Sequence, residues 1–192
     1  LCTPIRALQF QYPRGHRKEN LYMNTKNKYH RSILKDIARR AMLERGLLPD
    51  FSIEAIAELG RLQIPTAPEN GPIGDPNGMG DLRNFPWSSI DNDDSRDLDQ
   101  LTVAESTSAD KVKILVAIAD VASSILHGSA IDKHARTNTT SVYTAAEIFP
   151  MLPEKVSTDI TSLNFNEDRL AIIVEMSVDA DGLLEDSKIY RA

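Results

Sequence analysis

The sequence predicts an α+β protein in which a small N-terminal helical segment precedes a mostly antiparallel sheet domain. Apolar residues recur at helical spacing between Arg31 and Arg45, and Gly46 supplies a stop. Residues 61–80 are rich in Pro and Gly, as in a linker or an extended strap. Beyond them, apolar residues alternate with polar ones or form short runs, which is the pattern of β-strands.

The same patterns give the element and domain boundaries. Helices are expected at residues 31–45 and 53–59. Strands are expected near residues 87–91, 98–105, 112–119, 170–178 and 184–190, with helical or irregular segments near 130–138 and 158–163. The expected domains are a disordered extension at 1–22, a helical N-terminal segment at 23–60, a Pro/Gly-rich linker at 61–80 and the sheet domain at 81–192.

Length and composition limit the classes of protein. With 192 residues and 41% hydrophobic side chains, the chain can bury a sizeable core and should be globular. Its single cysteine rules out a disulfide framework and a cysteine-based zinc site. No apolar run approaches a membrane-spanning length and no signal-peptide pattern is present, so a reducing cytoplasm is the expected location.

Charge is divided unevenly along the chain. Residues 1–48 carry eleven Lys and Arg against three acidic residues, a net charge of +8, whereas residues 49–192 carry eleven against twenty-five, a net charge of −14. The basic segment could contact a nucleic-acid backbone, and the acidic remainder would then depend on bound metal to tolerate it. Solvated helix faces explain the same counts, so charge alone leaves both interpretations open.

Residues 91–100 concentrate acidic side chains, namely Asp91, Asp93, Asp94, Asp97 and Asp99, followed by Gln100. Crowded negative charge does not stabilise a fold, so a cation is expected to meet it. Oxygen-only ligands select hard divalent cations such as Mg²⁺ or Mn²⁺, and a substrate phosphate usually completes the shell of Mg²⁺. Phosphodiester chemistry is therefore the first hypothesis, and a solvated acidic loop is the alternative.

The acids are expected at the edge of a strand. Leu98 alternates with Asp97 and Asp99, so in extended chain the two carboxylates share a face, and Asp91 could fold back from the intervening turn. A calcium loop of the EF-hand type fits less well. Its sixth position would be Arg96 instead of Gly, and its twelfth position lacks the bidentate Glu.

The acids belong to a longer series of motifs. Those nearest to them are Asp81-Leu82-Arg83, Ser89-Ile90-Asp91 and Arg96-Asp97-Leu98-Asp99. Those that follow are Val116-Ala117-Ile118-Ala119-Asp120-Val121, Gly128-Ser129-Ala130-Ile131-Asp132, Thr140-Ser141-Val142-Tyr143, Phe149-Pro150-Met151-Leu152-Pro153, Ser162-Leu163-Asn164 and Asp168-Arg169-Leu170-Ala171. In order and spacing this series resembles the N-terminal part of the RNB catalytic domain of the RNase II and RNase R exoribonucleases. The sheet domain at 81–192 is then expected to be a partial RNB-type domain.

The resemblance implies hydrolytic removal of nucleotides from the 3′ end of single-stranded RNA, giving nucleoside 5′-monophosphates with Mg²⁺ or Mn²⁺. Asp91, Asp97 and Asp99 match the aspartate cluster of the family, which implies that they are the catalytic residues and the metal ligands. Tyr143 matches a position whose ring stacks on RNA bases. From the residues alone, Tyr143 is better explained as an ordinary half-buried strand tyrosine.

The chain departs from the family in two ways. The family pattern ends in two adjacent aspartates, and the second is Gln100 here, which brings no charge and is no general base. The family's domain also continues beyond this chain, which is then expected to be an incomplete catalytic unit that associates through an unfinished sheet edge. The alternative function is a catalytically silent RNA-binding fragment, and a structural fragment without a ligand is a third possibility.

Overall fold

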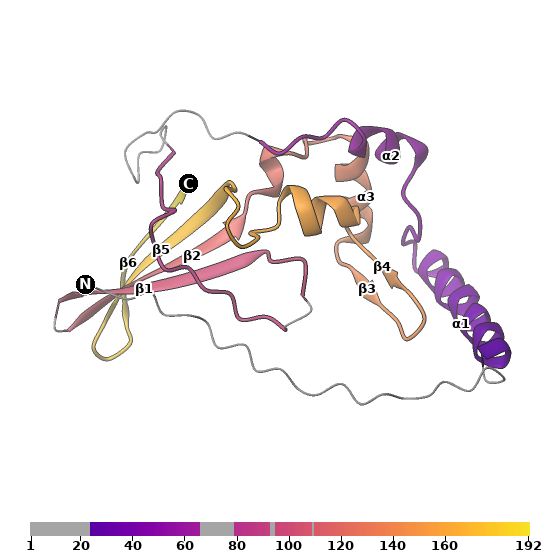
Figure 1. The fold of residues 1–192 in the computed structure, drawn as a ribbon, viewed down its shortest axis with the longest axis horizontal. Helices are drawn as coiled ribbons and strands as arrows, with labels where there is room; N and C mark the ends of the chain where they lie inside the picture. The colour runs from indigo at the N-terminus through magenta and orange to yellow at the C-terminus, as the bar shows by residue number, and fades with distance from the viewer. Residues whose placement is uncertain (1–23, 66–78, 93–94, 109) are drawn as a thin grey trace.

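The computed structural model describes residues 24–65, 79–92, 95–108 and 110–192 (Figure 1). The helical elements are α1 (Asn24–Glu44), α2 (Ile53–Leu59), the 3-10 turn η2 (Val121–Ser123), α3 (Ala130–Asn138) and the π-type turn η3 (Val156–Ile160). The strands are β1 (Gln100–Ser108), β2 (Lys111–Ala119), β3 (Val142–Tyr143), β4 (Ile148–Phe149), β5 (Ala171–Asp179) and β6 (Leu184–Arg191). The expected extension at residues 1–22 and most of the expected linker lie outside the described residues.

The main sheet has the strand order β1-β2-β5-β6, and every neighbouring pair is antiparallel. This confirms the expected α+β architecture with a mostly antiparallel sheet. The prediction of a strand at residues 87–91 is wrong, because within this range only Ser88 forms a bridge, to Thr102. Pro86 stands just before this range and has no N–H to give to a ladder. The short hairpin β3–β4 was not expected, since two-residue strands are too short to show alternation.

One face of the sheet covers the larger core. The buried residues of this core are Leu82, Val103, Leu115, Ala117, Leu163, Ala171, Ile173 and Tyr190. The opposite face is also apolar but more open, with Ile118 42% and Ile189 74% exposed. Among the described residues, no strand pairs with the outer edge of β6. The expected association through a sheet edge stays a prediction, and this edge and the open face beside it are where it would occur.

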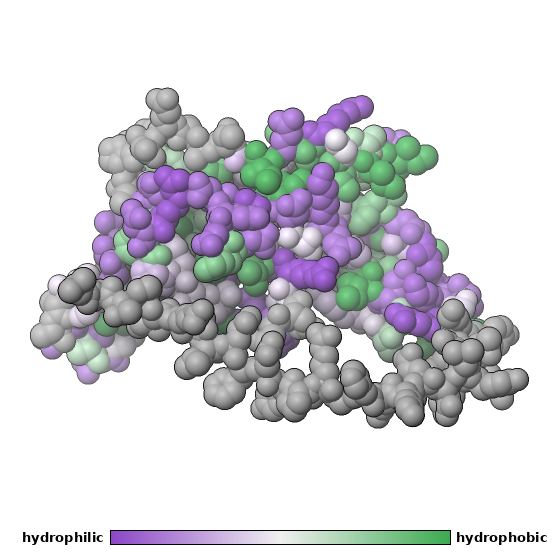
Figure 2. Space-filling view, in the orientation of Figure 1, coloured by the Kyte–Doolittle hydropathy of each residue, from purple (hydrophilic) through white to green (hydrophobic). Residues whose placement is uncertain are grey.

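A second core joins the N-terminal helical segment to the sheet domain. Its buried residues are Ala55, Ile125, Ile131 and Val156, with Phe51, Leu59 and Leu62 packed against them. The Glu58 carboxylate of α2 accepts hydrogen bonds from the backbone N–H groups of Ala130 and Ile131, at 2.8 and 3.2 Å. It thereby satisfies donors at the N-terminus of α3, where the helix dipole favours negative charge. The outer side of α2 stays apolar, and Figure 2 shows hydrophobic surface over this helix.

Helix α1 projects from the end of the molecule that carries α2, α3 and the β3–β4 hairpin (Figure 1). It begins at Asn24, before the expected residue 31. The residues at its start are mostly polar, so they can form a helix but show no apolar spacing from which to predict it. It ends at Glu44. Gly46 follows with a φ of 73°, its N–H donates to Leu43 O, and Leu47 N donates to Met42 O. Lys35 lies 3.5 Å from Glu147 of the hairpin. None of the helices that the structure describes combines the length and apolar character needed to span a bilayer.

Asn138 ties the segment after α1 to α3. Its side chain is buried, with Oδ1 accepting from Leu48 N at 2.8 Å and Nδ2 donating to Leu48 O at 2.9 Å. The second proton of Nδ2 faces His134 Nε2 at 3.0 Å, which places the ring proton on Nδ1. The His134 ring also lies 4.0 Å from the Phe51 ring. Burial lowers the pKa of His134, against the opposing effect of the Pro150 carbonyl.

We expect Asn138→Ala to lower the free energy of unfolding by about 1–3 kcal/mol, because the Leu48 N–H and C=O lose their partners. Chemical denaturation measures the change. Thr137→Ala is the matched control on the same helix, since Thr137 is exposed and its hydroxyl bonds only the Lys133 carbonyl of its own helix. Equal stability of the two variants would show that the Asn138 contacts contribute nothing.

We expect the free energy of unfolding to fall as the pH drops below about 6.5, the ordinary pKa of histidine. The unfolded chain then binds a proton at His134 that the folded chain does not bind until the pH reaches its lowered pKa. Above that window this residue adds no pH dependence. Denaturation curves of wild type, His134→Gln and the exposed His127→Gln measure it, and an equal slope in the two variants would contradict the assignment to His134.

Candidate metal-dependent active site

The outer edge of β1 brings Asp91 to Asp99. Ser88 and Thr102 exchange two backbone hydrogen bonds, of 3.0 and 2.8 Å, in antiparallel register. Among the described residues the bridge is isolated, and no ladder continues from it to Asp91 and Asp99, but it returns the segment of Asp91 to the edge of β1. A hollow of about 170 Å³ opens at this point, lined by Ser88, Ile90, Asp91, Asp99, Gln100 and Thr102. From the sequence alone, Asp91 could fold back from the intervening turn. In the structure, the bridge between Ser88 and Thr102 returns this segment to β1.

Asp97 does not line this hollow, although its side chain is exposed. Within the described ranges, no three His, Cys, Asp or Glu side chains are grouped closely enough to hold a metal ion. The structure thus brings together Asp91 and Asp99 of the three predicted ligands and does not bring Asp97 to them. Asp93 and Asp94 lie outside the described residues.

The donor chemistry of the hollow suits a hard divalent cation. Carboxylates from Asp91 and Asp99 and the amide of Gln100 offer only oxygen acceptors toward a cation, and Mg²⁺ is commonly held by one or two carboxylates with substrate phosphate oxygens. In the described part of the chain, Asp91, Asp97 and Asp99 form no ion pair with any Lys, Arg or His. Their charge is left uncompensated, which favours a bound cation.

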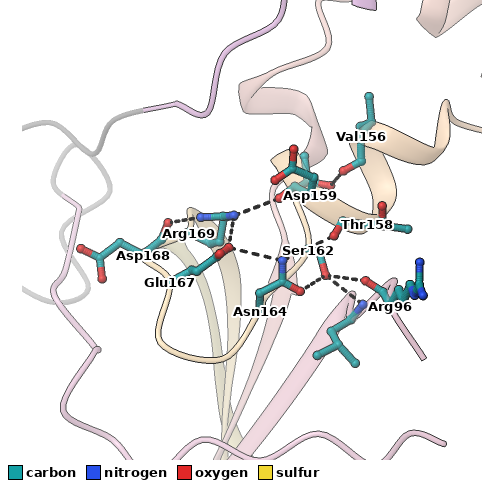
Figure 3. A network of polar contacts seen from close by, with 11 residues as sticks. Arg96, Val156, Thr158, Asp159, Ser162, Asn164, Glu167, Asp168 and Arg169 are labelled. Atoms are coloured by element: carbon teal, nitrogen blue, oxygen red, sulfur yellow. Dashed lines mark hydrogen bonds and ion pairs between the residues drawn. The ribbon is translucent and has the colours of Figure 1, made fainter. Parts of the chain in front are cut away.

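Ser162 fixes the backbone on both sides of Asp97. Its side chain is buried, and its Oγ accepts a hydrogen bond from Leu98 N at 3.1 Å. The same Oγ lies 3.0 Å from Arg96 O and 2.9 Å from Asn164 Oδ1 (Figure 3). Because a hydroxyl carries one proton, it donates to one of these two oxygens at a time.

Two backbone bonds complete the anchoring of the aspartate segment. Leu163 N donates to Leu98 O at 2.7 Å, and Ala119 N donates to Asp99 O at 2.9 Å. The segment is therefore held between the loop before β5 and the end of β2. Sequence reasoning gave Ser162 no role, since a hydroxyl that reaches a partner 64 residues away leaves no local pattern.

Tyr143 lies on the β3–β4 hairpin, opposite Ile148, and is 69% exposed. Its exposure differs from the half-buried strand tyrosine that the residues alone favoured. In the portion of the chain that is described, no ring contact or hydrogen bond joins Tyr143 to the aspartates. Its ring is accessible to a ligand, and its role in RNA binding stays a prediction.

Residues 79–192 match the family model of the RNB domain. The chain belongs to the RNB domain family. Ribonuclease R of Escherichia coli (strain K12) is 39% identical over 115 residues, which cover 60% of this chain and 14% of that protein. Exoribonuclease 2 of Shigella flexneri is 36% identical over 107 residues, which cover 56% of this chain and 17% of that protein.

The RNB fold is also found in solved structures. Mycoplasma genitalium RNase R in complex with ribose methylated single-stranded RNA matches with a TM-score of 0.66 and 29% identity, over 79% of this chain and 23% of that chain. The resemblance to the RNase II and RNase R family is thereby confirmed. This chain spans only a small part of the length of each relative, and it covers 14% of the Escherichia coli protein.

Two RNB motifs that are far apart in the sequence meet through Arg83. Its guanidinium bonds both carboxylate oxygens of Asp81, at 2.8 and 2.6 Å, and lies 2.8 Å from an oxygen of Asp168. This bidentate contact holds the pKa of Asp81 at about 2. The first residues of the RNB domain are thus fixed to the loop that precedes β5.

Asp120, at the end of β2, caps the turn that follows it. Its Oδ1 accepts a hydrogen bond from Ser123 N at 3.2 Å, and its Oδ2 lies 3.1 Å from Arg191 Nε, out of hydrogen-bond alignment. The carboxylate is buried and does not line the hollow. These contacts give Asp120 a structural role at the end of β2. The preceding residue, Ala119, donates its N–H to the backbone carbonyl of Asp99.

We expect Ser162→Ala to lower the free energy of unfolding by about 1–3 kcal/mol, because Leu98 N–H and Arg96 C=O lose a buried partner. The Leu98 amide should also exchange its hydrogen faster than in wild type. Ser157→Ala is the control, since Ser157 Oγ bonds only Glu154 O at 3.3 Å within the turn. Unchanged exchange at Leu98 would show that Ser162 does not anchor the aspartate segment.

Proposed function

We propose that this chain provides the aspartate-lined part of a 3′-to-5′ exoribonuclease, which hydrolyses single-stranded RNA to nucleoside 5′-monophosphates with Mg²⁺ or Mn²⁺. The observation that supports it is the hollow that Asp91 and Asp99 both line, inside an RNB domain, with no basic side chain among the described residues paired with either carboxylate. The named relatives are ribonucleases, and one of them binds single-stranded RNA.

In this proposal Asp91 and Asp99 hold the metal, and Asp97 joins from the neighbouring position of the same anchored segment. When bound, Mg²⁺ would lower the pKa of the attacking water and offset the charge that grows on the phosphate and the leaving 3′ oxygen. The protein's own contribution is positional, since the backbone bonds of Leu98 and Asp99 fix where the carboxylates start. Tyr143 would present its exposed ring to a base.

We expect Asp99→Asn to reduce mononucleotide release roughly 100-fold or more, because removal of groups that merely support a metal ligand already costs about 10- to 100-fold. The measurement uses 3′-labelled single-stranded RNA with Mg²⁺. The variant should fold normally, since the contact that holds Asp99 in place is made by its backbone carbonyl.

Asp186→Asn is the matched control, because Asp186 is an exposed acid on β6 and does not line the hollow. Release of mononucleotide by Asp99→Asn at the rate of Asp186→Asn would exclude Asp99 from the reaction. EDTA should abolish release by wild type, and metal-independent release would exclude the metal mechanism.

A catalytically silent RNA-binding chain is the second candidate, and the position of Gln100 favours it. Gln100 lines the hollow where the family pattern has a second adjacent aspartate, so the site carries one negative charge fewer. RNA binding without turnover by wild type would support this candidate. Turnover that then appears in Gln100→Asp would assign the silence to this amide.

A further inference from the structure

The loop between η3 and β5 presents the ring of Phe165 to solvent. Phe165 is 89% exposed, more than any other aromatic side chain in the described part of the chain, and Tyr143 follows at 69%. A single exposed apolar side chain is common on protein surfaces. Phe165 is distinguished by the rigidity of the loop that carries it and by what the same loop holds.

Side-chain contacts fix the loop on both sides of Phe165. Asn164 Nδ2 lies 3.4 Å from Thr158 O and 3.3 Å from a Glu167 carboxylate oxygen, and Glu167 N donates to Asn164 O at 3.3 Å. Arg169 donates to Asp159 O at 3.0 and 3.3 Å and pairs with Glu167 (Figure 3). The ring therefore projects from a backbone that loses little freedom when a ligand binds.

The same loop holds the aspartate segment of the proposed active site. Ser162, three residues before Phe165, contacts Arg96 O and Leu98 N, and Leu163 N bonds Leu98 O. The loop that carries the ring and the segment that carries Asp97 and Asp99 are thus parts of one anchored unit.

The charge of the loop does not oppose an RNA backbone as strongly as its acids suggest. Glu167 pairs with Arg169, and Asp168 lies 2.8 Å from a guanidinium nitrogen of Arg83. The guanidinium of Arg96 has no hydrogen-bond or ion-pair partner within the described residues, and Figure 3 shows it extending away from the network. A polyanion that approaches the loop meets these two paired acids and the guanidinium of Arg96, whereas Asp97 and Asp99 of the neighbouring segment have no ion-pair partner among the described residues.

We propose that Phe165 is a base-stacking residue for single-stranded RNA bound at the aspartate-lined site, an inference that rests on the proposed function. An aromatic face accepts every base because each base has a π face, so the residue would add affinity without sequence preference. The ring is carried by the same anchored loop whose Ser162 and Leu163 hold the backbone of the segment of Asp97 and Asp99. The ligand class assigned to Phe165 is therefore a nucleobase in a single strand.

The test measures binding of 5′-fluorescein single-stranded oligo(A) and oligo(U) by anisotropy in EDTA, which prevents metal-dependent hydrolysis. We expect Phe165→Ala to weaken binding of both oligomers roughly fivefold or more. Phe165→Leu should weaken it similarly, because it keeps an apolar side chain and loses the ring face, whereas Phe165→Tyr should bind like wild type. An abasic oligomer should bind equally to wild type and Phe165→Ala.

Leu183→Ala is the control, because Leu183 is 65% exposed and lies in the β5–β6 turn, away from the loop. Binding by Phe165→Ala or Phe165→Leu at the wild-type level would overturn the inference and leave the exoribonuclease proposal standing. Absence of RNA binding by wild type in EDTA would overturn the inference, whereas the exoribonuclease proposal is decided separately by mononucleotide release with Mg²⁺. A lower melting temperature of Phe165→Ala than of Leu183→Ala would assign Phe165 a structural role and likewise overturn the inference.

Discussion

The arrangement of the site depends on backbone hydrogen bonding around the start of β1. On its outer edge, the Ser88–Thr102 bridge returns the segment of Asp91 to β1, and Asp91 and Asp99 line one hollow. On its inner edge, β2 pairs with β1, and Ala119 N continues that pairing to Asp99 O. Backbone hydrogen bonds form between main-chain groups, so they can hold Asp91 and Asp99 at one hollow although their charges repel. In the proposed function, a bound cation would offset that repulsion.

Some acids of the sheet domain have basic partners. Examples are the Asp81–Arg83–Asp168 contact and the pairs of Lys111 with Glu185 and Lys113 with Glu175. Asp91, Asp97 and Asp99 have none among the described residues. An unpaired acid at the surface costs little alone, but neighbouring unpaired acids destabilise the fold unless a ligand neutralises them. The proposed function therefore needs a cation at the hollow, where Asp91 and Asp99 lie without a basic partner among the described residues.

The sequence predicts the regular elements better than the contacts between them. Helix α2 was predicted from its apolar spacing and flanking residues, since Ser52 caps its start and Gly60 follows its end. The shared face of Asp97 and Asp99 that a local period of two predicted stays a prediction, since Asp99 lines the hollow and Asp97 does not. The approach of Asp91 depends on a bridge between Ser88 and Thr102, and neither residue signals that pairing in advance. Ser162 is harder still, because a buried hydroxyl that bonds backbone groups across the fold looks like any other serine in the sequence.

Gln100 makes the proposed metal site depend on its substrate. The hollow contains two carboxylates, Asp91 and Asp99, and an amide where a further carboxylate would add a third charge. Mg²⁺ gives up its bound waters reluctantly, so a site with few charged ligands holds it weakly until phosphate oxygens join the shell. Binding free energies are reciprocal, and RNA must then tighten metal binding by the factor by which metal tightens RNA binding. With glutamine at this position, the proposed site would hold metal weakly by itself and would bind metal and RNA together. Residues that bind RNA independently of the metal, such as exposed aromatic rings, would then supply a larger share of the RNA affinity.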